Sequence, residues 1–252
     1  MNLAVNNQSL MLALGLVLIA LAIGWKEKLG IDKDMIIGVI RAVIQLFVVG
    51  YLLKSVFKVD NIWLTLTLIL IIIFNAGYNA KQRSNGIPDA LPISIGAILI
   101  STAVTLGVLM LAGAIKFIPA QMIPISGMIA SNSMVAIGLC YRNLNAQFRQ
   151  ERQAVLEKLA LGADLKDASK DILRDSIKTG MQPTIDGAKT VGIVSLPGMM
   201  SGLIFAGVDP VRAIKYQVMV TFMLLSATSI GSVLACYWAY KRFYNDQKQL
   251  LI

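Results

Sequence analysis

Seven apolar runs divide the chain, and most of them carry no charged residue over a length that would cross a bilayer. They cover residues 9–25, 35–53, 61–80, 90–115, 117–141, 190–208 and 216–240. A helix rises about 1.5 Å per residue, so about 20 apolar residues cross the hydrocarbon core. Residues 64–74 do not alternate between apolar and polar side chains, which excludes a membrane barrel. The pattern predicts an all-α, polytopic membrane protein with about seven transmembrane helices.

Charged residues between the runs predict an orientation. With seven spans and the N-terminus outside, the inner segments hold 16 Lys and Arg residues and the outer loops hold five. Basic residues concentrate on the cytoplasmic side of membrane proteins. We therefore expect the N-terminus outside and the C-terminus in the cytoplasm, with the basic excess near anionic lipid headgroups.

Composition narrows the class of protein further. The chain is 56% hydrophobic and 15% charged, where a soluble domain has about a quarter charged residues. We expect one transmembrane domain over residues 1–252. The chain has no histidine, which excludes histidine-based catalysis and histidine metal ligands. Cys140 and Cys236 lack ligand spacing and are typical of packed membrane helices.

One long polar segment, residues 142–182, separates the fifth and sixth runs on the predicted cytoplasmic side. It carries eight basic and six acidic residues over an apolar stripe formed by Val155, Leu156, Leu159, Leu165, Ala168 and Ile172. Gly162 is expected to separate two helices, and Pro183 to begin the next. The segment is either an amphipathic hairpin that caps its own bundle or a docking platform for a cytoplasmic partner.

Polar residues interrupt the second and third runs. Arg41 and Gln45 lie one turn apart, as do Asn75 and Asn79. Arg41 either extends to the inner surface or shares a polar face with Gln45. The asparagines either join helices by hydrogen bonds or line a pathway.

The fifth run is unusually polar between residues 126 and 134, where Met128 and Asn132 share a helical face and Met134 points elsewhere. The sixth run contains Pro197, Gly198, Met199 and Met200. Proline removes a backbone donor, and a broken helix near the midplane is a common transport site. Close packing of small residues is the alternative.

The last run begins with Tyr216 and Gln217, after an expected helix start at Asp209 and Pro210. Asp186 and Lys189 precede the sixth run and are interpreted as an ion pair at the inner membrane surface. Methionine is a common filler of membrane helices, and its thioether as a ligand suits copper(I) better than iron.

No Gly-Lys dipeptide occurs, so the chain lacks the phosphate-binding loop of a P-loop ATPase. The Ser-His-Asp triad, the HExxH motif of zinc proteases and a paired-cysteine zinc motif are also missing. We therefore expect a transport subunit and not an enzyme, with no cofactor of its own.

Several motifs together resemble the bacterial iron-export ABC transporter permease family (FetB-like). The resemblance rests on Arg41-Ala42 with Gln45, on the block from Gly127 to Met134, and on Ser195-Leu196-Pro197-Gly198-Met199-Met200 followed by Lys215-Tyr216-Gln217. It covers nearly the whole chain. It implies a permease subunit in the plasma membrane of a bacterium that exports iron. The permease would form a homodimer, in the usual arrangement of two permeases and two ATPases, and the separate P-loop ATPase would bind ATP and Mg²⁺.

The ATPase contact is expected at the segment that includes Glu157, Leu159, Gly162 and Ala163, which is similar to the coupling motif of ABC permeases. The substrate pathway or hinge is expected at Met128, Asn132, Met134, Pro197, Gly198, Met199, Met200, Tyr216 and Gln217. Arg41, Gln45, Asn75 and Asn79 would line or support it. Three alternatives stay open: an ion-coupled secondary transporter, an ABC permease for another small solute, and a membrane scaffold that recruits a soluble partner.

Overall fold

The computed structural model describes residues 7–57, 59 and 61–251, and this part of the chain contains helices and no strands. Six of its helices are long and apolar enough to cross a membrane. The chain divides into two compact units, Met1–Asp60 and Asn61–Ile252. The all-α prediction is therefore confirmed for this part of the chain, which has six helices that could span a membrane where about seven were predicted.

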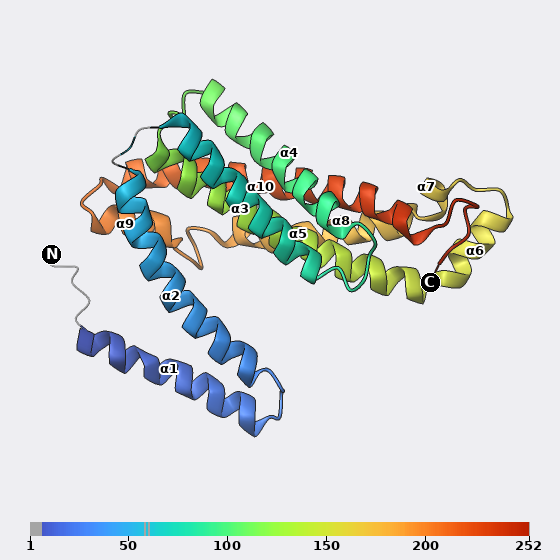
Figure 1. Ribbon diagram of the computed structural model, residues 1–252, viewed down its shortest axis with the longest axis horizontal. Coiled ribbons are helices and arrows are strands. Elements are labelled where there is room, and N and C mark those ends of the chain that lie inside the picture. The colour runs from blue at the N-terminus through green and yellow to red at the C-terminus, as the bar shows by residue number, and fades with distance from the viewer. Residues whose placement is uncertain (1–6, 58, 60, 252) are drawn as a thin grey trace. The chain divides into compact units, whose positions relative to one another are not determined.

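The first unit is a helical hairpin. Helix α1 (Asn7–Lys26) and helix α2 (Asp32–Val56) are joined by a short turn (Figure 1). The helices touch beside this turn, where a Cβ atom on Gly24 would lie 2.8 Å from Asp32 Oδ1. Most other side chains of the hairpin are exposed and apolar, as in helices that lipid or protein covers.

The second unit is a bundle whose long helices run in alternating directions (Figure 1). Its elements are α3 (Ile62–Gln82), α4 (Ala90–Leu111), α5 (Pro119–Gln150), α6 (Arg152–Ala160), α7 (Leu165–Ala168), α8 (Lys170–Thr190), α9 (Gly198–Phe205), α10 (Pro210–Ala239) and a 3₁₀ turn (Tyr240–Phe243). We call one end of the bundle the α6 end, where α6 and α7 lie. The opposite end, with α9 and the start of α10, is the α9 end (Figure 1).

Helix α5 is the centre of this bundle and packs against α3, α4, α8 and α10. Its buried side chains recur every three or four residues and include Ile129, Ile137, Tyr141, Leu144 and Phe148. The Tyr141 hydroxyl lies 2.9 Å from Ser94 Oγ, so the polar end of this buried ring has a partner on α4. The core thus connects α5 to each of its neighbours.

Helix starts follow the sequence signals. Asn61 Oδ1 accepts hydrogen bonds from the backbone N–H of Trp63 and Leu64 at the start of α3. Asp209 Oδ1 accepts one from Arg212 N–H, and Pro210 is the first residue of α10. The predicted start of the last helix at Asp209 and Pro210 is confirmed.

Residues 190–208 do not form the single spanning helix that the sequence predicted. Helix α8 ends at Thr190, and α9 is an eight-residue helix that begins at Gly198. The return path along the bundle is formed by α8, the non-helical residues 191–197 and α9 (Figure 1). Hydropathy missed this arrangement because an apolar run does not require one continuous helix.

The predicted loop over residues 142–182 is also largely helical. Helix α5 continues to Gln150, and α8 begins at Lys170 and packs on α5 and α10. The prediction that Pro183 starts a helix is wrong, since it lies inside α8. The prediction for Gly162 is confirmed: it lies between α6 and α7 with φ of +90°, a conformation that glycine adopts without strain.

The apolar stripe of this segment faces the bundle. Val155, Ala168 and Ile172 are buried, and Leu156, Leu159 and Leu165 pack against the core. The C-terminal residues cover the same region: Phe148 stacks on Phe243 with ring centroids 4.3 Å apart. The apolar stripe of this segment therefore caps its own bundle at the α6 end, while the outer side of the segment stays exposed at Leu161.

Candidate transport site

The break between α8 and α9 organises the candidate site. A tight turn follows Thr190, in which Val194 N–H donates to Thr190 O at 2.9 Å and Gly192 N–H donates to Ser195 O at 2.9 Å. Gly192 has φ of +85°, which ends the helix. Pro197 then has an extended backbone and directly precedes α9. The chain therefore departs from helix inside an otherwise helical bundle, and a cavity lies on either side of this break.

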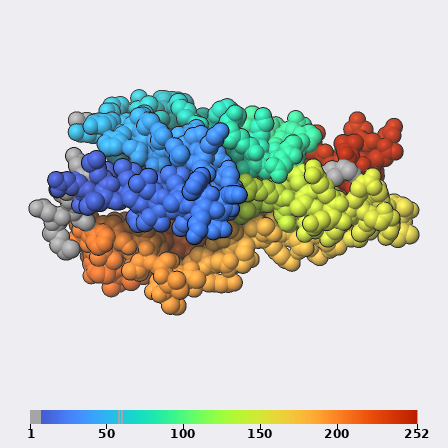
Figure 2. Space-filling model, turned by 90° about the horizontal axis from the view of Figure 1, so that it is seen from below, coloured from blue at the N-terminus to red at the C-terminus, as the bar shows by residue number. Residues whose placement is uncertain are grey.

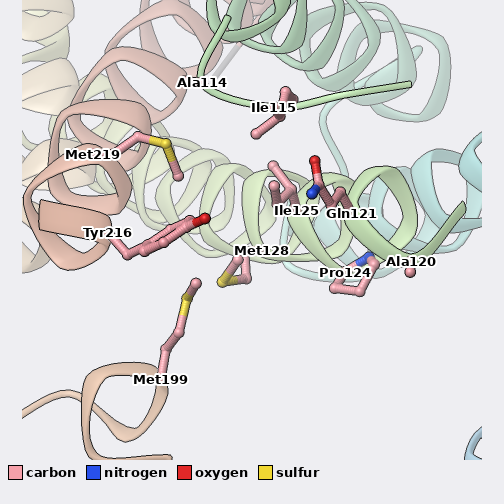
Figure 3. Close-up of a pocket in the computed structure, with 10 residues that line it drawn as sticks. All are labelled: Ala114, Ile115, Ala120, Gln121, Pro124, Ile125, Met128, Met199, Tyr216 and Met219. Carbon is pink, nitrogen blue, oxygen red and sulfur yellow. The ribbon is translucent and has the colours of Figure 1, made fainter. Parts of the chain in front are cut away.

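The first cavity, which we call the methionine cavity, has a volume of about 360 Å³ (Figure 3). It is lined by Ala114, Ile115, Ala120, Gln121, Pro124, Ile125, Met128, Met199, Tyr216 and Met219. Figure 3 shows Met128, Met199 and Met219 arranged around the Tyr216 ring, from α5, α9 and α10 respectively. The walls are apolar apart from Tyr216 and Gln121. The methionine cavity can therefore hold an apolar or soft group, since thioethers are soft ligands.

The second cavity, which we call the amide cavity, has a volume of about 300 Å³ and lies between α5, α8 and α10. It is lined by Asn132, Pro183, Thr184, Gly187, Ala188, Val191, Ser195, Pro197, Gln217, Thr221 and Leu224. Asn132 Nδ2 donates to Met128 O at 2.9 Å, which fixes the amide on its helix. Gln217 Oε1 is buried and has no hydrogen-bond partner among the described residues. A buried amide oxygen without a partner suits a cation or a water molecule.

Six of the nine predicted pathway residues line these two cavities. Met128, Met199 and Tyr216 line the methionine cavity. Asn132, Pro197 and Gln217 line the amide cavity. Met134 is half-buried against the core, Gly198 is exposed at the first turn of α9, and Met200 is half-buried on α9. These last three line neither cavity.

Of the four predicted support residues, two lie on α3 of the second unit and two on α2 of the first unit. Asn75 and Asn79 are on the exposed face of α3, where their Nδ2 atoms donate to Ile71 O and Asn75 O. They contact their own helix, so the structure does not bring them to either cavity. Arg41 and Gln45 are exposed on α2 in the first unit.

The predicted coupling residues form the turn at the α6 end. Glu157 is exposed and accepts a hydrogen bond from Gln153 Nε2 at 3.0 Å, whereas Leu159 packs inward. Gly162 and Ala163 follow at the turn between α6 and α7. Lys158 donates to Asp171 Oδ2 at 3.0 Å, and this contact lowers the pKa of the Asp171 carboxyl below its ordinary value. The turn is thereby tied to α8.

Sequence reasoning missed several residues of these sites. Leu161, at the tip of the α6–α7 turn, is 89% exposed although it is apolar. Thr184, Ser195 and Thr221 contribute to the amide cavity. The exposure of Leu161 identifies the first position, and the packing of α8, α10 and residues 191–197 around one cavity identifies the other three. In the described part of the chain, no three His, Cys, Asp or Glu side chains gather in a group that could hold a metal ion.

Comparison with known proteins places this architecture in one family. The model of the uncharacterised protein family UPF0014 matches residues 7–244. The chain is 56% identical over 248 residues to the probable iron export permease protein FetB of Escherichia coli (strain K12), covering 98% of this chain and 96% of that protein.

More distant relatives match over similar lengths. The UPF0014 membrane protein YjkA of Bacillus subtilis (strain 168) is 34% identical, with 96% of this chain and 97% of that protein covered. Protein ALUMINUM SENSITIVE 3 of Arabidopsis thaliana is 32% identical, with 94% and 87% covered. No solved structure matches.

Proposed function

This chain belongs to the uncharacterised protein family UPF0014, and we propose that it is the permease subunit of an ABC transporter that exports iron across the bacterial cytoplasmic membrane. A separate P-loop ATPase would bind ATP and Mg²⁺ and power it. The substrate comes from the similarity to the probable iron export permease. The working unit would contain two permeases, with the N-terminus outside and the C-terminus in the cytoplasm.

The observation that carries this proposal is the pair of cavities beside the broken segment between α8 and α9. Asn132 and Gln217 offer amide oxygens in the amide cavity, and Thr184 and Thr221 add hydroxyls. Iron(II) accepts oxygen as well as nitrogen ligands, and in the methionine cavity only the Tyr216 and Gln121 side chains offer them. We therefore assign cation passage to the amide cavity and a hinge or gate to the methionine cavity.

The α6 end supplies a surface for the ATPase. Leu161 protrudes at the turn, and Glu157 is exposed one turn before it on α6. An exposed leucine at the end of a short helix can anchor that helix in an apolar groove of a partner. Lys158 and the apolar stripe from Val155 to Ile172 attach this turn to α8. A displacement of Leu161 by the ATPase would therefore also displace α8, which lines the amide cavity.

Transport by inside-out vesicles tests the proposal. Vesicles that contain the permease and its ATPase should accumulate iron(II) when ATP is added, and should not when the ATPase nucleotide site is inactivated. Accumulation that persists without ATP would instead support an ion-coupled secondary transporter. Copper(I), manganese(II), aluminium and an organic anion serve as competing substrates, and preferential transport of one of these would reject iron as the substrate.

Docking of the ATPase is tested at the protruding leucine. Leu161→Asp should abolish co-purification of the ATPase, because a carboxylate would be buried in an apolar contact. Ala154→Asp, on the exposed side of α6, is the matched control and should co-purify normally. Equal co-purification of both variants would show that the ATPase binds elsewhere.

A further inference from the structure

The uncharged stretches of α5 and α10, which pack against α8, indicate the level at which α8 lies along the bundle. Helix α5 carries no charged residue from Pro119 to Tyr141, and α10 carries none from Tyr216 to its end. Ala130 and Thr228 mark the middle of these stretches. On α8, Thr184 and Ala188 line the same cavity as Asn132 and Leu224. This part of α8 therefore lies at about the level of the middle of the uncharged stretches of α5 and α10.

A charged cluster occupies the opposite face of α8 at this level. Gln182 Nε2 donates to both carboxylate oxygens of Asp186, each at 2.9 Å. Lys189 Nζ lies 3.6 Å from Asp186 Oδ1. The three residues are spaced by four and three positions, which places them on one side of a helix.

This face is not covered by the rest of its own unit. The side chains of Asp186 and Lys189 are 53% and 68% exposed. In Figure 2 the golden α8 and the orange α9 form the lower margin of the second unit, beside the yellow α6. Charged side chains in a membrane interior face water or protein, because lipid cannot solvate them. The exposed face of α4, in contrast, is apolar at Leu99, Ile100 and Val104.

We propose that the face formed by Gln182, Asp186 and Lys189 lines a water-filled cation path, in which the Asp186 carboxylate receives the cation and releases the Lys189 ammonium. This rests on the proposed function and gives the cation a second binding position, with an acidic ligand, on the face of α8 opposite the amide cavity. Without a cation, Lys189 neutralises Asp186. A hard divalent cation competes for the same carboxylate, and the Gln182 amide oxygen becomes a second ligand when its N–H group turns away.

Water access is tested by cysteine labelling of the full-length chain in membrane vesicles. Gln182→Cys and Lys189→Cys, on either side of Asp186, should react with a charged, membrane-impermeant methanethiosulfonate reagent. Ile100→Cys is the control, because its neighbour Ser101 lies 3.4 Å from Ser133 of α5 and thus at a similar depth. We expect labelling at least tenfold faster at the two α8 positions than at Ile100→Cys. The native Cys140 and Cys236 are buried and give a low background.

Cation binding is tested with the same label. Anaerobic iron(II) should slow labelling of Gln182→Cys severalfold relative to sodium at equal ionic strength, and Asp186→Asn in the same chain should remove this protection. Rates at both α8 positions no faster than at Ile100→Cys, with full labelling after denaturation, would refute the water-filled path. So would a disulfide between two copies at Lys189→Cys without labelling.

Labelling without protection by iron(II) would refute the cation role of Asp186. None of these measurements needs ATP or the ATPase. Failure of the cation path is therefore distinct from failure of the proposed transport, which is read from ATP-dependent accumulation.

Discussion

Gly180 of α8 lies directly against Cys140 of α5, with no space between them for a methyl group. A Cβ atom on Gly180 would also lie 2.8 Å from the backbone oxygen of Ala136 and 3.1 Å from Ser232 Oγ of α10. Gly180 is the last buried residue of α8, so a single small residue controls how closely this part of the return path can approach α5 and α10.

Gly180→Ala should therefore destabilise the protein, by about 1–3 kcal/mol, because the added methyl group overpacks the contact. The measurement is thermal unfolding in detergent. Gly187→Ala in the same helix is the control, since open space surrounds its Cβ position, and it should leave the unfolding temperature equal or slightly higher. Equal losses for both variants would contradict the close approach of α8 to α5.

Removal of the unpartnered amide oxygen of Gln217 should raise the stability of the protein and lower its transport rate. In Gln217→Leu the buried Oε1 atom is lost, which should raise stability by about 1 kcal/mol, because a buried polar group without a partner is costly. Iron(II) accumulation should fall about tenfold, corresponding to about 1.4 kcal/mol of lost cation stabilisation.

Asn132→Leu should lower transport in the same way, and Ser131→Ala, exposed on the same helix, should not. The readouts are initial transport rates and unfolding temperatures in matched preparations. Normal transport by both leucine variants would exclude the amide cavity from the cation route.

The C-terminal segment should loosen at high pH. Tyr244 is buried, its hydroxyl lies 2.6 Å from Ser169 Oγ, and burial raises the pKa of the Tyr244 phenol above its ordinary value. A folded-state pKa above the unfolded value, near 10, gives stability that is complete below about pH 10 and lost as pH rises through the folded pKa.

Proteolysis of the C-terminal segment between pH 9 and 12 measures this loss. Tyr244→Phe cannot ionise, so its cleavage rate should rise less steeply with pH than that of the unmodified chain, although it is higher at pH 9 because the bond to Ser169 is gone. Parallel curves for the two proteins would assign the loosening to other groups.

The predicted orientation has a direct test at the tip of the α6–α7 turn. Leu161→Cys should react with an impermeant thiol reagent only from the cytoplasmic side, because Leu161 is 89% exposed and lies in the most basic of the connecting segments. Intact cells and inside-out vesicles provide the two accessible sides. Labelling in intact cells would reverse the orientation and remove the proposed ATPase contact.

Sequence alone determined the elements whose signals are local. Uncharged stretches of sufficient length predicted α1 to α5 and α10, because burial of backbone polar groups in lipid requires helices. Asp209-Pro210 and Gly162 were correctly read as a helix start and a helix break, since both effects act within one turn. Met128, Asn132, Pro197, Met199, Tyr216 and Gln217 were selected because they interrupt apolar runs.

Only the tertiary structure showed which face of α8 is buried and which helices it packs against. In the sequence, the charged residues of α8 are typical of a solvated helix. On its other face, however, Gly180 packs against Cys140, and Thr184 lines the same cavity as Asn132. The same packing places Thr184 and Ala188 of α8 beside Asn132 of α5, and residues 190–208 form a turn and a short helix. Hydropathy measures composition along the chain, whereas the depth of a helix depends on which neighbours its small residues allow it to approach.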